Sequence, residues 1–157
     1  MLEIKGNLNA KGVRLGIAVS RFNDRITKEL LAGAVEMYRR LGGDEADLTV
    51  VWVPGALELP LAAKKLAEKP EIHAVVALGA VIRGATYHFD VVAGQSAAGL
   101  MKAQLDTEKP IVNAVLTTDT IEQAIERAGT KAGNKGADAV MAAVEMVRVL
   151  GEVRSGR

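Results

Sequence analysis

Four runs dominated by aliphatic residues, separated from one another by helical patterns, constrain the fold of this chain more than any other feature. They are Val13–Val19, Leu48–Val53, Ile72–Val81 and Ile111–Leu116. Strands built almost entirely from Val, Ile, Leu and Ala are typical of parallel sheets that are covered on both faces. Parallel strands need crossover connections, and these are right-handed. The sequence therefore predicts an α/β, three-layer, flavodoxin-like fold, in which a four-stranded parallel sheet carries helices on both faces.

The segments between the runs have the apolar spacing of amphipathic helices. A glycine pair, Gly42–Gly43, ends the first of them, and Asp119–Glu122 has the sequence of a capping box at the start of another. Helices are expected over Lys28–Leu41, from after Pro54–Gly55 to about Lys69, from Thr86 to about Asp106, from Asp119 onward, and after the glycine loop Gly133–Gly136 to about Leu150.

Length and composition exclude several classes of protein. The chain has 157 residues and is predicted to be one domain, 1–157, in which residues 1–11 form either a loose arm or a strand added to a neighbouring subunit. The formal net charge of +1, with no basic run, argues against a nucleic-acid partner. Because the chain has no cysteine and only two histidines, His73 and His88, it cannot build a metal site from cysteines or clustered histidines.

The N-terminus and two of the expected helices indicate where the protein is located and whether it forms an oligomer. The N-terminus lacks the apolar segment of a signal peptide and no run is long enough to cross a bilayer, so a cytoplasmic location without a membrane partner is expected. The last helix has only a narrow polar stripe, and the helix from Thr86 carries the small residues Ala93, Gly94 and Ser96–Gly99. A helix with so much apolar or small-sided surface is either buried within the protomer or packed on another subunit, and we predict a homo-oligomer.

The third apolar run ends in Ile82–Asp90, a glycine turn that leads into a helical pattern. If Thr86 caps this helix, the backbone N–H groups around Gly84 are unpaired and form a site for an anion. His88 lies in the first helical turn, where the positive end of the helix dipole disfavours the imidazolium. A neutral imidazole beside a phosphate-sized site suits proton transfer on a phosphorylated substrate. The alternative is that this turn has a purely structural role.

Three loops follow the first three strands, and their residues are expected to converge because ligands of such sheets bind beyond the carboxyl ends of the strands. The loops are Ser20–Asn23, Pro54–Glu58 and Arg83–His88. Phe22 is either a hydrophobic contact for the following helix or a plate on which a flat ring stacks. Glu58 is either a carboxylate favoured by the helix dipole or an acceptor for the hydroxyl groups of a ligand.

Two basic residues allow two interpretations each. Arg127 is expected near the end of a short helix, where a cation is favoured in any case, and Lys135 is expected in a glycine loop, where it can be solvated. Alternatively, both residues bind a phosphate or an oxyanion.

Two long segments, Arg83–Asp90 and Glu122–Gly136, closely resemble the 6,7-dimethyl-8-ribityllumazine synthase family, and Ser20–Asn23 and Val53–Gly55 match it in the same order. The resemblance covers nearly the whole chain. It implies an enzyme, a transferase that condenses 5-amino-6-(D-ribitylamino)uracil with 3,4-dihydroxy-2-butanone 4-phosphate. The product is 6,7-dimethyl-8-ribityllumazine, in the penultimate step of riboflavin biosynthesis. The resemblance implies neither a cofactor nor a metal.

The resemblance also implies a role for individual residues. The catalytic residues would be His88, which transfers protons, together with Arg127 and Lys135. The phosphate would be bound by Ala85, Thr86 and Arg127. The pyrimidine and its ribityl chain would be bound by Phe22, Ala56, Leu57, Glu58, Ala80, Val81, Ile82 and Asn113. In the family, the residues that correspond to Asn113, Arg127 and Lys135 come from the adjacent subunit of a pentamer.

The chain departs from the family in two places. Relatives usually have an aromatic residue where this chain has Asn113, and often one where it has Leu57. The pyrimidine would then have fewer planar contacts, with an amide that supplies hydrogen bonds instead. No insertion interrupts Gly129–Gly136, which favours a closed icosahedral shell of twelve pentamers, sixty subunits, over an isolated pentamer. Riboflavin synthase is a further candidate partner.

Three other functions fit the sequence less well. A non-catalytic flavin- or nucleotide-binding module would need a longer, hydroxyl-rich loop than Ser20–Asp24 after the first strand. A signalling receiver domain would need an acidic cluster at the strand ends, where this chain has Ser20 and Arg21. A storage shell with a vestigial site would bind the substrates without forming the lumazine.

Overall fold

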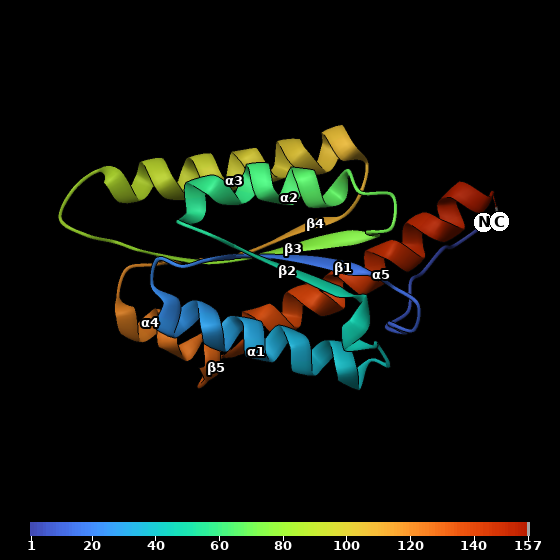
Figure 1. Cartoon of the computed structure of the whole chain (residues 1–157), viewed down its shortest axis with the longest axis horizontal. Helices are drawn as coiled ribbons and strands as arrows, with labels where there is room; N and C mark the ends of the chain where they lie inside the picture. Colours follow the sequence, from blue (N-terminus) through green and yellow to red (C-terminus); the bar gives the residue numbers. More distant parts are fainter. Residues whose placement is uncertain (157) are drawn as a thin grey trace.

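The predicted parallel sheet is present, and all four predicted strands form it (Figure 1). In the computed structural model the strand order is β2-β1-β3-β4, and every neighbouring pair is parallel. The strands are β1 (Leu15–Ser20), β2 (Leu48–Val53), β3 (Ala74–Ile82) and β4 (Ile111–Thr118). The structure describes residues 1–156, so the last residue of the predicted domain lies outside it.

Within the described residues, five α-helices cover the sheet in two layers. They are α1 (Asp24–Arg40), α2 (Leu59–Ala67), α3 (His88–Thr107), α4 (Ile121–Glu126) and α5 (Lys135–Ser155). Helices α2 and α3 lie on one face, and α1, α4 and α5 lie on the other (Figure 1). This arrangement confirms the three-layer α/β prediction.

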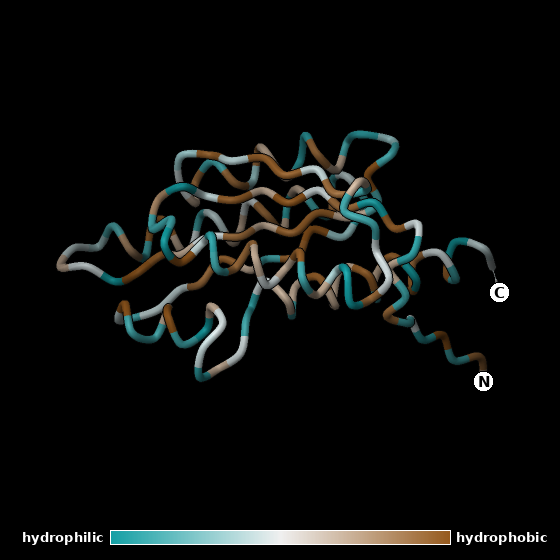
Figure 2. Tube along the Cα trace, turned by 60° about the horizontal axis from the view of Figure 1, so that its bottom comes forward, coloured by the Kyte–Doolittle hydropathy of each residue, from teal (hydrophilic) through white to brown (hydrophobic). Residues whose placement is uncertain are grey.

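The two central strands explain why the sequence shows continuous apolar runs rather than alternation. Every residue of β1 is buried, and every residue of β3 except Ile82. Both strands pair on both edges and carry helices on both faces, so neither has a face in contact with water. Figure 2 shows the hydrophobic residues concentrated along these strands. A separate apolar cluster lies on each side of the sheet, one against α1 and α5 and one against α2 and α3.

A buried tyrosine joins α1 to the chain just before β1. The hydroxyl of Tyr38 donates a hydrogen bond of 2.5 Å to the carbonyl of Val13, and the side chain is fully buried. Burial raises the pKa of Tyr38 to about 12, so the phenol keeps the proton that this bond requires. Within residues 1–156, every buried side-chain polar atom has a hydrogen-bond partner.

Several predicted boundaries are wrong. Helix α1 begins at Asp24 rather than Lys28, because Asn23 adopts a left-handed backbone with φ of 61° and the helix starts directly after it. Helix α5 begins at Lys135 and reaches Ser155, well past Leu150. The single helix expected after Pro54–Gly55 is divided into a 3-10 turn, η2 (Ala56–Glu58), and α2. A further 3-10 turn, η1 (Glu45–Asp47), precedes β2.

The structure also contains a small hairpin that the sequence did not indicate. It consists of β5 (Ala128–Thr130) and β6 (Gly133–Asn134), which pair antiparallel in place of the expected plain glycine loop. Gly129 and Gly133 have φ of 110° and 73°, a conformation that other residues rarely adopt, so these glycines permit the tight reversal.

The N-terminal residues 1–10 form no helix or strand, and residues 9–11 are attached to α5. The guanidinium of Arg148 donates to the carbonyls of Asn9 and Lys11 at 2.7 to 3.0 Å. Among the described residues, no helix has the length and apolar character needed to cross a membrane.

His73 extends the pairing of β1 with β3 through its side chain. Its Nδ1 accepts a hydrogen bond of 2.8 Å from the backbone N–H of Arg14, and its own backbone N–H donates to the carbonyl of Arg14 at 2.9 Å. Burial lowers the pKa of His73, and the positive charges of Lys109, Arg14 and Arg148 add to this effect, against a smaller opposing contribution from Asp47. These surroundings therefore favour the neutral imidazole over the charged one.

We expect the stability of the protein to depend on the charge of His73. Because the pKa of His73 is lower in the folded state, the unfolded chain takes up the proton first. The contribution of neutral His73 to the free energy of unfolding is therefore fully present above about pH 6.5, and it is lost as the pH falls toward the folded-state pKa. In His73→Asn, the amide oxygen replaces Nδ1 as acceptor and does not titrate. Scanning fluorimetry should show a smaller fall in Tm toward pH 5 for this variant, and equal falls would contradict the expectation.

Candidate active site

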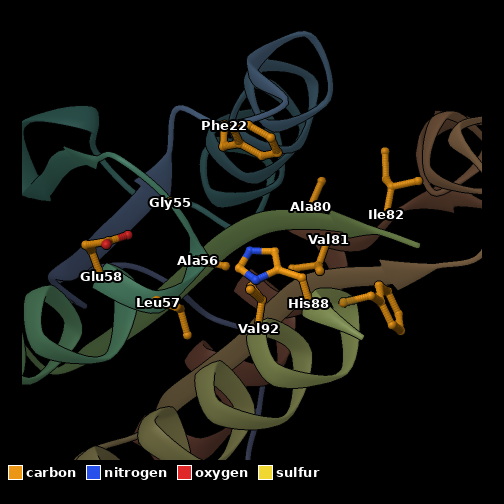
Figure 3. Close-up of a pocket in the computed structure, with 11 residues that line it drawn as sticks. Phe22, Gly55, Ala56, Leu57, Glu58, Ala80, Val81, Ile82, His88 and Val92 are labelled. Carbon is orange, nitrogen blue, oxygen red and sulfur yellow. The ribbon is translucent and has the colours of Figure 1, made fainter. Parts of the chain in front are cut away.

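The carboxyl ends of β1, β2 and β3 and the first turn of α3 enclose a cavity of about 250 Å³ (Figure 3). This is the edge at which the loops were predicted to converge. The cavity is lined by Phe22, Gly55, Ala56, Leu57, Glu58, Ala80, Val81, Ile82, His88, Phe89 and Val92. A largely apolar lining with a few polar groups is typical of a site for a small molecule.

Phe22 stands free at the rim of this cavity. The backbone continues the β1–β2 pairing past the strands, since Arg21 donates to Val53 at 2.8 Å and Phe22 donates to Pro54 at 3.1 Å. The side chain of Asn23 then donates to the carbonyl of Ala80 at 2.9 Å. The Phe22 ring is 71% exposed, so it makes little contact with α1. Of the two interpretations of Phe22, the exposure favours a plate for a flat ring.

His88 is the first residue of α3, and its ring points into the cavity near Ala56, Val81 and Val92 (Figure 3). The prediction that Thr86 occupies the cap position of this helix is wrong. Tyr87 occupies it, with a helical backbone and no side-chain cap. The hydroxyl of Thr86 instead accepts a hydrogen bond of 3.4 Å from the N–H of His88. Ala85 and Thr86 lie in the exposed turn beside the cavity and are not part of its lining.

Glu58 is the one acidic residue in the lining of this cavity. It ends the turn η2 and directly precedes α2, where it makes no side-chain cap. Its carboxylate makes no capping hydrogen bond to α2 and lies in the cavity lining, where its oxygens can accept from a ligand. This favours the interpretation of Glu58 as an acceptor for hydroxyl groups.

The remaining predicted site residues line a second cavity, of about 480 Å³, along the free edge of β4. Asn113 lies on β4, and its side-chain oxygen accepts from the N–H of Val115 at 2.8 Å. Arg127 and Lys135 are brought together by the hairpin, because the N–H of Lys135 donates to the carbonyl of Arg127 at 2.9 Å. Contrary to the expectation of a loop position, Lys135 is the first residue of α5, and its amine pairs with Asp138 at 3.1 Å.

Close packing fixes the start of α5, and with it Lys135. A Cβ atom on Gly136 would lie 2.1 Å from the carbonyl oxygen of Leu30 on α1, so only glycine fits between these helices. Asn134 caps α5 by accepting from the N–H groups of Gly136 and Ala137. Arg127 directly follows α4 at its C-terminal cap position, where its guanidinium donates to the carbonyl of Gln123 at 3.0 Å.

The two cavities have complementary chemistry. The lining of the first holds Phe22, Glu58 and His88 but neither lysine nor arginine. The lining of the second holds Arg127 and Lys135 but neither an aromatic residue nor a histidine. A single protomer therefore does not bring the predicted cations to the predicted proton-transfer residue. Within the described residues, no group of three or more His, Cys, Asp and Glu side chains could hold a metal ion.

The predicted site omitted Gly55, Phe89 and Val92 of the first cavity, and Asn23 beside it. Phe89 and Val92 line it from α3, at positions where an apolar residue in a helix ordinarily indicates core. Asn23 holds the Phe22 loop against β3, and the signal for it was available, because asparagine is one of the few residues that tolerate a left-handed backbone at a turn.

Comparison with known proteins agrees with this geometry. A family model described as 6,7-dimethyl-8-ribityllumazine synthase matches residues 12–151, which include both cavities. The chain belongs to the 6,7-dimethyl-8-ribityllumazine synthase family. It is 68% identical over 143 residues to a 6,7-dimethyl-8-ribityllumazine synthase of Thermus thermophilus, with 91% of each chain covered. The same figures hold for the enzyme of the same name from a second strain of this species.

We expect Phe22→Ala to weaken the binding of a flat heterocycle and to leave the fold unchanged. The ring is mostly exposed, so its removal costs little core packing, while a lost stacking contact costs about 1 kcal/mol, or roughly fivefold in Kd. Titration with 6,7-dimethyl-8-ribityllumazine, followed by fluorescence, measures the Kd, and Tm reports the fold. Leu61→Ala, at a similarly exposed apolar residue outside the cavity, is the control. An unchanged Kd for Phe22→Ala would contradict the stacking role.

Proposed function

We propose that this chain catalyses the condensation of 5-amino-6-(D-ribitylamino)uracil with 3,4-dihydroxy-2-butanone 4-phosphate to 6,7-dimethyl-8-ribityllumazine, in riboflavin biosynthesis. Membership of the lumazine synthase family supports this reaction. The observation that carries it is the first cavity, which gathers an exposed aromatic ring, a carboxylate and an imidazole at the carboxyl edge of the sheet.

The proposed chemistry forms two C–N bonds and releases phosphate and two molecules of water. The primary amine of the pyrimidine adds to the ketone, and loss of water gives an imine. Removal of a proton from the adjacent carbon then expels the phosphate and leaves an enol, which becomes a second carbonyl. The ribityl-bearing amine attacks this carbonyl, and loss of water closes the ring. No step requires an oxidant or a reductant.

Each proposed role matches the chemistry of the side chain. Phe22 stacks on the pyrimidine, and the carboxylate of Glu58 accepts from hydroxyl groups of the ribityl chain, with Ala56, Leu57 and Ala80–Ile82 around them. His88 moves the proton whose loss releases the phosphate. The exposed turn with Ala85 and Thr86 receives the phosphate, and Arg127 and Lys135 neutralise its charge. Asn113 offers its amide N–H₂ to the pyrimidine, since the amide oxygen is already bonded to Val115.

Positioning is expected to supply more of the rate than proton transfer. Holding two reactants in register is worth about 7–11 kcal/mol. A single general acid or base contributes roughly 10²–10⁴-fold, or about 3–5 kcal/mol. The cavity is therefore proposed to act chiefly by aligning the amine with the ketone.

We further propose that the complete site lies between two protomers of a homopentamer. The separation of the cations from His88 in one protomer supports this, because a phosphate bound beside His88 would otherwise lack a cationic partner in the cavity lining. Exposed apolar residues on α3, among them Met101 and Leu105, provide surface for such contacts.

Three further proposals rest on the family alone. They are the shell of twelve pentamers, the cytoplasmic location and riboflavin synthase as a partner. Sedimentation would separate a shell, of about 1 MDa for 16.6 kDa subunits, from a pentamer.

The direct test mixes both substrates with the protein and follows the fluorescence of the lumazine product. Catalytic turnover is the expected result. A protein that binds the substrates without turnover would instead be a storage shell, and one that is purified with stoichiometric flavin and has no turnover would be a flavin-binding module.

We expect His88→Ala to lower kcat by about 10²-fold and to leave measurable activity, because positioning survives the loss of the proton shuttle. The same fluorescence assay measures the rate. His73→Asn is the matched control, since it alters the other histidine at the opposite end of the sheet and is expected to keep full activity. Complete inactivity of a correctly assembled His88→Ala protein would contradict the dominance of positioning.

Arg127→Ala is expected to raise the KM for the phosphorylated substrate and to leave the KM for the pyrimidine nearly unchanged.

If the site is shared between protomers, co-expression of His88→Ala with Arg127→Ala subunits places an intact His88 of one protomer beside an intact Arg127 of the next in some of the sites. These intact sites should restore up to about a quarter of the wild-type activity. Each variant alone is the control. Mixed assemblies no more active than the better single variant would show that both residues act within one protomer.

A further inference from the structure

Arg83 forms a three-way contact that none of the proposed roles uses. Its Nε donates to Asp119 at 2.8 Å, its Nη1 lies 3.7 Å from Asp90, and its guanidinium carbon lies 4.2 Å from the centre of the Phe89 ring. Its backbone N–H also donates to the carbonyl of Thr118 at 2.9 Å. One side chain thus joins the end of β3 to the segment that follows β4 and to the first turn of α3.

The segment between these contacts has little other support. Residues 83–88 are all exposed, and Figure 1 shows the connection from β3 to α3 as an extended loop that projects beyond the sheet. A Cβ atom on Gly84 would meet no atom within 4 Å, so no neighbouring element packs against that position. The only side-chain hydrogen bond made within the turn itself is the one of 3.4 Å between Thr86 and the N–H of His88.

We propose that Arg83 is a positioning residue, which holds the turn Gly84–Tyr87 in the shape that receives a phosphate and directs His88 into the cavity. The proposal rests on the function proposed above. Arg83 anchors the start of the turn to Asp119, and it fastens the far end through Asp90 and Phe89, which follow His88 along α3. The planar guanidinium suits this task, because it can donate in two directions while one of its faces covers an aromatic ring.

The contacts argue against Arg83 as a direct ligand of the phosphate. Two carboxylates and an aromatic ring already hold the guanidinium, and Arg83 is absent from the cavity lining, which includes Ile82 and His88 on either side of the turn. The two roles predict opposite effects of removing Asp119. If Arg83 bound the phosphate directly, removal of Asp119 would free its guanidinium for the phosphate and would not raise the KM. If Arg83 positions the turn, removal of Asp119 takes away its anchor and raises the KM for the phosphorylated substrate.

The test compares Arg83→Met, Asp119→Asn and the double variant. We expect Arg83→Met to raise the KM for the phosphorylated substrate by about tenfold and Asp119→Asn by about threefold. The double variant should be no worse than Arg83→Met, because the loss of Arg83 already removes the contact that Asp119→Asn weakens. The KM for the pyrimidine should change by less than about twofold, and Tm should stay within a few degrees, since exposed ion pairs contribute little stability.

Arg39→Met is the matched control, because Arg39 is a similarly exposed arginine with two carboxylate partners, Glu36 and Glu45, outside the cavity. It should leave both KM values unchanged. A lower or unchanged KM for the phosphorylated substrate in Asp119→Asn, or additive effects in the double variant, would overturn the proposal. So would an equal rise in both KM values of Arg83→Met together with a fall in Tm, which would indicate a general structural role.

A second measurement does not depend on turnover. Hydrogen exchange of the full-length wild-type protein and of Arg83→Met should show faster exchange in a peptide that spans residues 83–90 of the variant, with the core strands unchanged. Unchanged exchange in this peptide would overturn the inference even if the wild type forms the lumazine. If the wild type forms no lumazine but the exchange differs as expected, the proposed reaction fails and the positioning of the turn by Arg83 stands.

Discussion

The parallel pairing of β1 with β3, buried on both faces, is the interaction on which the rest of this structure depends. Because the strands run in one direction, the segments that leave β1, β2 and β3 emerge at the same edge of the sheet. Phe22, Glu58 and His88 are far apart in the sequence and meet only for this reason. A reversed strand would send its loop to the opposite edge, so the cavity requires the topology as much as the side chains.

The order of the strands also explains why the predicted site is divided. Strand β4 is the last in the sheet, so one of its edges is unpaired, and Asn113 lies beside Arg127 and Lys135 along this edge. The hairpin β5–β6 and the close contact of Gly136 with Leu30 fix the two cations there. In the proposed pentamer, the cations that bind the phosphate would meet the imidazole only when protomers associate, so activity would depend on assembly.

The strands were predictable and several helix starts were not, and the difference has a physical cause. An apolar run such as Ile72–Val81 reports burial on both faces, and burial is what forms the strand. The start of a helix depends instead on one or two backbone conformations. Asn23 in a left-handed conformation starts α1 early, and the absence of a cap at Thr86 delays α3 until His88. The hairpin escaped prediction because β5 and β6 are too short to show any periodicity.

The sequence by itself determined the class of fold, the family, and the identity of most residues that line the first cavity, because burial patterns and specific motifs are local properties of the chain. Of the lining of the second cavity, it indicated Asn113, Arg127 and Lys135. It left open whether Phe22 packs on a helix or stands free, where Lys135 lies, and which groups Arg83 contacts. Only the tertiary structure decided these points. Exposure, the partners of a charged side chain and the distance between segments are properties of the packed molecule, and residues such as Arg83 and Asp119 become neighbours only after β3 and β4 have paired.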